Sequence, residues 1–348
     1  MRVVVTGATG NVGTSVLESL AGEPAVEVVA VARRAPRRTF PQTTFVAADI
    51  ARSELVPILA GADAVVHLAW LIQPGRDEPL THSVNVAGSE RLFRAIVEAK
   101  VPSLVYASSV GAYSPGPKDR LVDESWPTEG IATSFYSRHK VAVERQLDRL
   151  ERERPELRVV RMRPGLIFKR EAATEIRRLF AGPLLPGGLL RPGLIPFVPD
   201  VPRLRFQAVH SLDVGDAYRR AVIGDARGPF NLAADPPIGP VELAEILGAR
   251  RVKMPPGVLR ALAAATFTLR LQPSEPGWLD MALAVPLMDS SRAQDQLGWV
   301  PAHSAIDTFT ELLAGMRSGS DLDTPPLARG TSGPGRIREI LTGIGKRP

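Results

Sequence analysis

The chain has 348 residues, of which 44% are hydrophobic and 23% charged, as in a globular protein of one large or two modest domains. It contains no cysteine, which excludes disulfides, thiolate catalysis and cysteine-ligated zinc. The net charge of +6 is spread over short basic clusters without interleaved aromatic residues, so we expect no nucleic-acid partner. Glycine comes too early for a signal peptide, and no apolar run is long enough to span a bilayer. We therefore expect a cytoplasmic protein without a membrane partner.

Apolar, β-branched runs alternate with helical patterns over residues 1–165. The runs are "RVVVTG", "VEVVAVA", "TTFVAAD", "ADAVVHLA", "SLVYASS" and "LRVVRMRP". This alternation predicts an α/β fold, a doubly wound parallel sheet with helices on both faces. We expect segments near 206–235 to return to this domain, residues 166–317 to form a smaller substrate-binding region, and residues 318–348 to be a linker with a short basic helix, "RIREILTGI".

Three glycines follow the first predicted strand in "VVVTGATGNVG". Gly7, Gly10 and Gly13 stand at the first strand-to-helix junction, where a dinucleotide-binding loop is expected. Glycine lets the backbone approach a pyrophosphate, and the free N–H groups at the helix start face the anion. We assign Thr9, Asn11 and Val12 of this loop to the same cofactor site.

The end of the second predicted strand, "VVAVARR", bears on which nicotinamide cofactor binds. An acidic residue at this place would accept a hydrogen bond from the ribose 2′-OH of NAD. Ala32 stands there instead, followed by Arg33 and Arg34. Because guanidinium groups bind a phosphate bidentately, the sequence favours NADP over NAD.

Tyr136 and Lys140, in "YSRHK", lie four residues apart and share one face of a predicted helix. A nearby ammonium lowers the pKa of a phenol, so we expect Lys140 to make Tyr136 a general acid/base near neutral pH. Ser109, at the end of the "YASSV" strand, would bind and polarise the substrate oxygen, with Ser108 as its competitor. We expect His139 to lie on the surface. No residues have metal-ligand spacing.

The motifs "TGATGNVG", "HLA", "YASSVGAY" and "YSRHK", with "AVHSLDVGDA" and "LGWVPAHS" further on, resemble the extended short-chain dehydrogenase/reductase superfamily, in its NAD-dependent epimerase/dehydratase branch. The likeness covers about residues 1–315. It implies a Rossmann-type fold, Ser109 rather than Ser108 as the catalytic serine, and a homodimer formed through residues 82–99 and the Tyr136 helix. It also implies a cofactor site that includes Asp49, Ile50, Leu68, Ala69, Tyr136, Lys140, Pro164 and Ile167.

Two features separate the chain from nucleotide-sugar enzymes of this branch. Gly165 stands where those enzymes commonly have an asparagine that holds the nucleotide phosphates, and residues 184–199 are strongly apolar. We therefore expect an NADP-dependent oxidoreductase that transfers hydride between nicotinamide C4 and a carbonyl or secondary alcohol of a small, apolar substrate. Two alternatives stay open: a nucleotide-sugar epimerase or dehydratase, and a non-catalytic dinucleotide-binding sensor or assembly protein.

Overall fold

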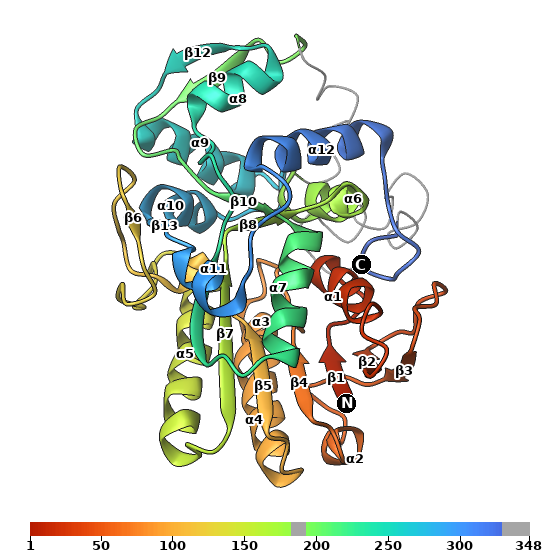
Figure 1. Cartoon of the computed structure of the whole chain (residues 1–348). Helices are drawn as coiled ribbons and strands as arrows, with labels where there is room; N and C mark the ends of the chain where they lie inside the picture. Colours follow the sequence, from red (N-terminus) through yellow and green to blue (C-terminus); the bar gives the residue numbers. More distant parts are fainter. Residues whose placement is uncertain (182–192, 329–348) are drawn as a thin grey trace.

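Seven parallel strands form the central sheet of the computed structural model, which describes residues 1–181 and 193–328 (Figure 1). Their order across the sheet is β11-β7-β5-β4-β1-β2-β3. The bounds are β1 Arg2–Thr6, β2 Glu27–Ala32, β3 Thr43–Ala47, β4 Ala64–His67, β5 Ser103–Ala107, β7 Arg158–Pro164 and β11 Gly228–Leu232. The expected doubly wound α/β fold is confirmed, and the last strand comes from the segment near 206–235.

Helices cover both faces of this sheet, as they must when each strand is apolar on both sides. Within β1, Val3 and Val5 pack with one set of helices while Val4 packs with the other, which reflects the two-residue period of a strand. The first set is α1 Asn11–Leu20, α7 Ser211–Ile223 and α11 Ser291–Leu297. The second set is α2 Val56–Leu59, α4 Gly88–Glu98 and α5 Phe135–Glu153.

The strand order reverses between β1 and β4, which are neighbours in the sheet although β2 and β3 separate them in sequence. In open α/β sheets, ligands bind in the crevice outside the carboxyl ends of the strands at such a point. Figure 1 shows the rest of the chain gathered above these carboxyl ends. A cavity lies at this point, lined by residues that follow the strands, such as Gly7 and Leu68, and by residues of the second region, such as Glu175 and Pro273.

Three short parallel strand pairs lie outside the central sheet. The pairs are β8 Leu166–Phe168 with β10 Ala208–His210, β9 Phe197–Asp200 with β12 Arg250–Lys253, and β6 Leu121–Val122 with β13 Leu287–Met288. The remaining helical elements are α3 Glu78–His82, η1 Ser83–Ala87, η2 Val110–Ala112, η3 Arg170–Ala172, α6 Ala173–Ile176, η4 Arg177–Ala181, α8 Pro240–Leu247, α9 Pro256–Thr268, α10 Pro276–Ala284 and α12 Ala305–Ser318.

Two sequence expectations concern segments only partly described. Most of the apolar stretch 184–199, and the whole basic helix expected near the C-terminus, lie outside the described residues. The expected linker differs from the structure over residues 319–328, because Thr324 and Leu327 there are 1% and 0% exposed. This part of the chain is packed against the domain.

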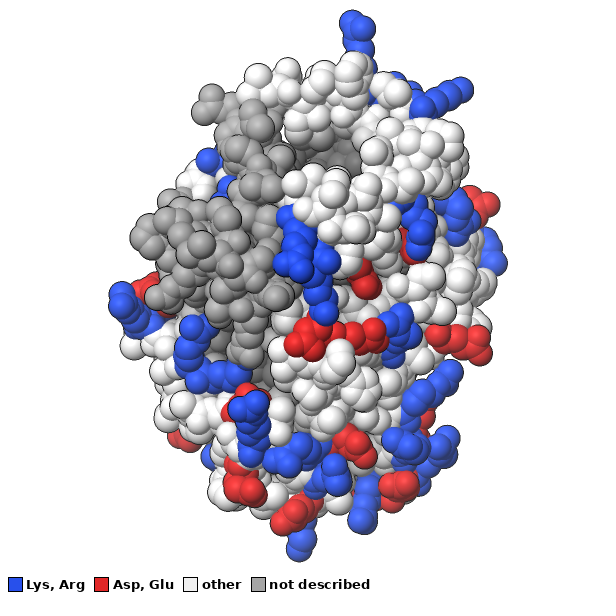
Figure 2. All heavy atoms as spheres, turned by 180° about the vertical axis from the view of Figure 1, so that it is seen from behind, with Lys and Arg blue, Asp and Glu red and all other residues white. Residues whose placement is uncertain are grey.

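Positive and negative side chains alternate over the face of the molecule in Figure 2, rather than gathering into one basic surface. Among the described helices, none combines the length and apolar character needed to cross a bilayer.

Candidate active site

The glycine loop between β1 and α1 is closely packed against the backbone that follows β4, a strand next to β1 in the sheet. Gly7 has φ +71°, and a Cβ atom there would lie 2.6 Å from the backbone nitrogen of Ala69. A Cβ on Gly13 would lie 2.4 Å from the Gly7 carbonyl oxygen. At Gly10 the nearest atom would be 3.5 Å away, so this glycine is the least constrained by its neighbours. The loop therefore has the close backbone approach that a pyrophosphate cradle needs.

A cavity of about 320 Å³ opens beside this loop. Nine residues expected to bind the cofactor line it: Gly7, Thr9, Gly10, Arg33, Arg34, Asp49, Ile50, Leu68 and Ala69. They follow the carboxyl ends of β1, β2, β3 and β4, the four neighbouring strands that include the point between β1 and β4 where the strand order reverses. The lining fits a dinucleotide, because it joins a glycine cradle to charged side chains at the far end.

Seven other residues expected at the cofactor site do not line this cavity: Asn11, Val12, Gly13, Tyr136, Lys140, Pro164 and Ile167. The side-chain nitrogen of Asn11 donates to the Ile167 carbonyl oxygen at 3.0 Å, which ties the start of α1 to β8. The Asn11 Oδ1 atom is buried without a hydrogen-bond partner among the described residues.

One part of the cavity is bordered by the ends of β2 and β3. Arg33 and Arg34 are exposed and follow Ala32 directly. Asp49 accepts a hydrogen bond from the Ala51 N–H at 2.9 Å, and its own N–H donates to Ser53 at 2.9 Å. The cavity thus has two guanidinium groups where an NAD site would have a carboxylate.

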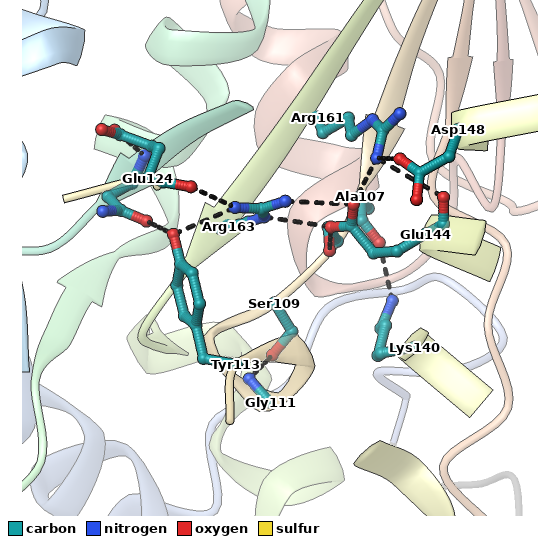
Figure 3. Close-up of polar contacts among 12 residues, drawn as sticks. Ala107, Ser109, Gly111, Tyr113, Glu124, Lys140, Glu144, Asp148, Arg161 and Arg163 are labelled. Carbon is teal, nitrogen blue, oxygen red and sulfur yellow. Dashed lines mark hydrogen bonds and ion pairs between the residues drawn. The ribbon is translucent and has the colours of Figure 1, made fainter. Parts of the chain in front are cut away.

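The structure brings the three expected catalytic residues together. Tyr136 on α5 is hydrogen-bonded through its side chain to Ser109, which follows β5. The Ser109 hydroxyl also accepts from the Gly111 N–H at 3.0 Å (Figure 3). Lys140 lies one helical turn beyond Tyr136, with its Nζ 5.6 Å from the centre of the tyrosine ring.

The sequence predicts that Lys140 lowers the pKa of Tyr136, but in the structure this pKa is raised. Burial raises the pKa of Tyr136 to about 12, and the hydrogen bond from Ser109 only partly opposes this. The phenol is therefore protonated at neutral pH. In this state Tyr136 is a proton donor, as needed when a carbonyl is reduced to an alcohol.

Lys140 is buried at the end of β5. Its ammonium donates to the Ala107 carbonyl oxygen at 2.6 Å (Figure 3). It also lies 3.5 Å from the centre of the Trp70 ring. Burial lowers the Lys140 pKa well below its usual value, and Glu144 opposes this only in part. No carboxylate forms an ion pair with Lys140 in the part of the chain that the structure describes.

Aromatic rings enclose Tyr136, and the sequence reasoning did not identify them. The Trp278 ring centre lies 4.8 Å from that of Tyr136, and the Trp70 ring centre lies 5.9 Å from it. Phe180 packs edge-on against Trp278 at 5.0 Å. Trp70 follows "HLA" directly and also lines the cavity, so its position next to the motif was a usable signal. Trp278 comes from α10, and no motif marks it.

Ser108 belongs to a different set of contacts. Its hydroxyl donates to Glu144 at 2.5 Å, and the other oxygen of this carboxylate accepts from Arg161 at 2.7 Å. Arg163 reaches both oxygens, at 3.0 and 3.1 Å (Figure 3). Burial alone would raise the Glu144 pKa, but the two guanidinium groups outweigh it and lower the pKa to about 2. This cluster is a buried ion-pair network behind the catalytic residues.

Two histidines near the site are buried. The expectation that His139 lies on the surface is wrong: it is 2% exposed and packs against Phe135 and His82. Burial, with His82 nearby, lowers its pKa to about 4. His67 in β4 is held between Thr6 and Ser89 at 2.8 and 2.9 Å.

No group of three or more His, Asp or Glu side chains within residues 1–181 and 193–328 is arranged to hold a metal ion.

A family model described as "NAD dependent epimerase/dehydratase family" matches residues 3–179. An uncharacterized protein of Mycobacterium bovis is 27% identical over 320 residues, which are 91% of this chain but 30% of that protein. The chain therefore spans less than a third of the length of this relative. Short-chain dehydrogenase/reductase family 42E member 1 of Xenopus laevis is 32% identical over 149 residues, covering 41% of this chain and 38% of that protein.

Among solved structures, UDP-glucose 4-epimerase of Thermus thermophilus in complex with NAD superimposes with a TM-score of 0.68. It is 21% identical, with 91% of this chain and 99% of that chain covered. This likeness shows the fold. The matched family model, which covers half of the chain, identifies the chain as a member of the NAD-dependent epimerase/dehydratase family.

Proposed function

We propose that this protein is an NADP-dependent oxidoreductase that transfers hydride between nicotinamide C4 and a carbonyl or secondary alcohol of a small, apolar substrate. The observation that carries the proposal is the setting of Tyr136, a phenol enclosed by Trp70 and Trp278 and hydrogen-bonded to Ser109. An enclosure made of aromatic rings favours apolar ligands. The bound nicotinamide would supply the hydride.

Each catalytic residue has one task in this proposal. Ser109 binds the substrate oxygen and orients it toward Tyr136, which donates the proton that the developing alkoxide needs. Lys140 offers an ammonium at the end of β5, where it would hold the hydroxyl groups of the nicotinamide ribose. Because Lys140 has no carboxylate partner among the described residues, its charge is available to a ligand.

The choice of NADP is supported by Arg33 and Arg34 at the edge of the cavity, after Ala32. A 2′-phosphate would meet two guanidinium groups, each able to form charge-assisted hydrogen bonds.

Gly165 supports a substrate other than a nucleotide sugar. A Cβ atom at this position would lie 2.5 Å from the Gln207 carbonyl oxygen, so an asparagine could enter only if β8 and β10 moved apart. The chain thus lacks both the phosphate-holding side chain and the room for it.

A nucleotide-sugar epimerase or dehydratase is the second candidate, because several solved structures with this fold were determined with UDP-sugars and NAD. The test incubates the protein with NADPH and either apolar ketones or UDP-sugars, and follows nicotinamide absorbance and product identity. We expect net oxidation of NADPH with an apolar ketone. Sugar interconversion without net cofactor change would overturn the proposal in favour of the second candidate. NADPH binding without any turnover would favour a sensor.

We also propose a homodimer formed through residues 82–99 and α5. The large apolar side chains that are exposed in the described part of the chain include none from these helices, so the contact would be mainly polar. Sedimentation should give twice the 37.5 kDa mass of the chain at micromolar concentration, and a single-chain mass would contradict the dimer.

A further inference from the structure

The segment after α12 is fixed at its start to the second region. Gly319 ends the helix with φ 62°, and the Ser320 N–H donates to the Gly315 carbonyl oxygen at 2.8 Å. The Thr174 hydroxyl donates to the Ser320 carbonyl oxygen at 2.7 Å, and Arg170 donates to the Ser320 hydroxyl at 3.3 Å. These contacts hold the segment against η3 and α6.

Four residues later the same segment contacts the glycine loop. The Thr324 hydroxyl donates to the Thr9 carbonyl oxygen at 2.8 Å, and this contact is buried. The N–H groups of Leu327 and Ala328 donate back to the Thr324 carbonyl oxygen at 3.0 and 2.9 Å, which closes a turn. Thr324 is 1% exposed and Leu327 is fully buried, so the turn is packed and not merely resting on the surface.

Pro325 and Pro326, at the tip of this turn, line the same cavity as Gly7, Thr9 and Gly10. The Pro326 carbonyl oxygen accepts from Arg178 at 2.7 Å, which ties the tip to η4. The segment therefore borders the expected pyrophosphate position and bridges the two regions of the molecule. Figure 1 shows it descending from α12 toward α1.

We propose that residues 319–328, which we call the C-terminal strap, form a wall of the dinucleotide site and slow the exchange of bound cofactor, with Thr324 as the positioning residue that holds the strap on the loop. The proposal rests on the dinucleotide site described above. Thr9 belongs to the loop whose backbone N–H groups face the phosphates, so a strap bonded to its carbonyl oxygen lies next to the ligand. Proline has no N–H group, so the two prolines add a wall without adding a backbone donor.

The effect of the strap on the turnover rate would differ between the two reaction types considered for this site. A dehydrogenase must exchange its cofactor after each turnover, whereas an epimerase regenerates the cofactor in place. Slow cofactor exchange caused by the strap would limit the turnover rate of a dehydrogenase, but it would not slow an epimerase.

The test compares Thr324→Val with the unmodified protein by stopped-flow fluorescence, with displacement of bound NADPH by excess NADP. Thr266→Val is the matched control, because its hydroxyl bonds to Leu262 at 2.8 Å within α9, away from the cavity. We expect NADPH to dissociate about 3- to 10-fold faster from Thr324→Val, the factor for loss of one neutral hydrogen bond, and unchanged from the control. An unchanged rate in Thr324→Val would overturn the proposal.

A second measurement needs no variant. The amide protons of Leu327 and Ala328 report opening of the turn, and saturating NADPH should slow their exchange with deuterium in the unmodified protein. Exchange that NADPH does not slow would overturn the strap proposal even if Thr324→Val failed to fold. Failure of the unmodified protein to bind either NADPH or NADH would overturn the proposed function as well, so the two failures are distinguishable.

Discussion

Ser108 and Ser109 are neighbours in the chain, yet their hydroxyl groups belong to two different polar clusters. Ser108 donates to Glu144, whereas Ser109 is hydrogen-bonded to Tyr136. The same division occurs on α5, where Lys140 and Glu144 are one turn apart and enter different clusters. Adjacent residues at one strand end and along one helix thus belong either to the ion-pair network or to the proposed catalytic site.

The ionisable groups of the two clusters differ in whether the charged form is stabilised. Glu144 has guanidinium groups against both oxygens, which keep it charged with a pKa of about 2. Burial instead raises the pKa of Tyr136 and lowers that of Lys140, and the negative charge of Glu144 opposes the second shift only in part. Ionisable groups with strongly perturbed pKa values cluster at functional sites. We infer that the network supports the helix and that the second cluster performs the chemistry.

The largest expected effect is on turnover. Tyr136→Phe removes one oxygen and leaves the ring between Trp70 and Trp278, so the fold and the glycine loop stay intact. Loss of the proton donor should lower the rate by about 10²–10⁴-fold with little change in NADPH affinity. A fluorescence titration of NADPH beside a turnover assay checks both expectations. Activity close to that of the unmodified protein would place the chemistry elsewhere.

A substitution in the ion-pair network should lower the stability of the protein rather than its catalytic rate. Glu144→Gln leaves Arg161 and Arg163 buried without their shared counter-charge, which should lower the free energy of unfolding by about 3–5 kcal/mol. Urea denaturation measures this loss. Glu153→Gln, at an exposed position near the end of the same helix, is the control and should have almost no effect. Equal stability of the two variants would show that the network does not support the fold.

Acid should weaken the same network. The pKa of Glu144 is about 2 in the folded protein and 4.5 in its ordinary state, so its contribution to stability is present above about pH 4.5 and is lost as pH falls toward 2. Thermal unfolding between these pH values should lose stability more steeply in the unmodified protein than in Glu144→Gln. Parallel pH curves would contradict this assignment.

A smaller effect is expected on cofactor choice. Arg33→Ala with Arg34→Ala should bring the dissociation constants of NADPH and NADH closer together, since each lost charge-assisted contact costs about 1.5–3 kcal/mol. NADH affinity serves as the internal control and should change little. If the unmodified protein binds the two cofactors equally well, the arginines do not select NADP.

Much of the fold follows from patterns that lie within short stretches of sequence. The strand runs, the glycine spacing and the four-residue separation of Tyr136 and Lys140 are local, and each has one structural solution in a doubly wound sheet. The position of β11 at the sheet edge follows less directly, because its segment comes 64 residues after β7 ends.

The features that the sequence did not reveal depend on contacts between distant residues. Trp278 reaches Tyr136 from α10, and the strap reaches Thr9 from more than 300 residues away. His139 was expected on the surface because its neighbour Lys140 faces inward, but α3 covers the adjoining face of α5 through His82. The pKa of Tyr136 likewise depends on burial, which outweighs the hydrogen bond from Ser109.

A crystal structure with NADP bound tests the central claim most directly. We expect the pyrophosphate to bind at the Gly7–Gly13 loop, next to Pro325 and Pro326. The nicotinamide ring should face Tyr136 and Ser109, and the Lys140 ammonium should contact the ribose. A nicotinamide ring bound away from Tyr136 and Ser109 would contradict the account.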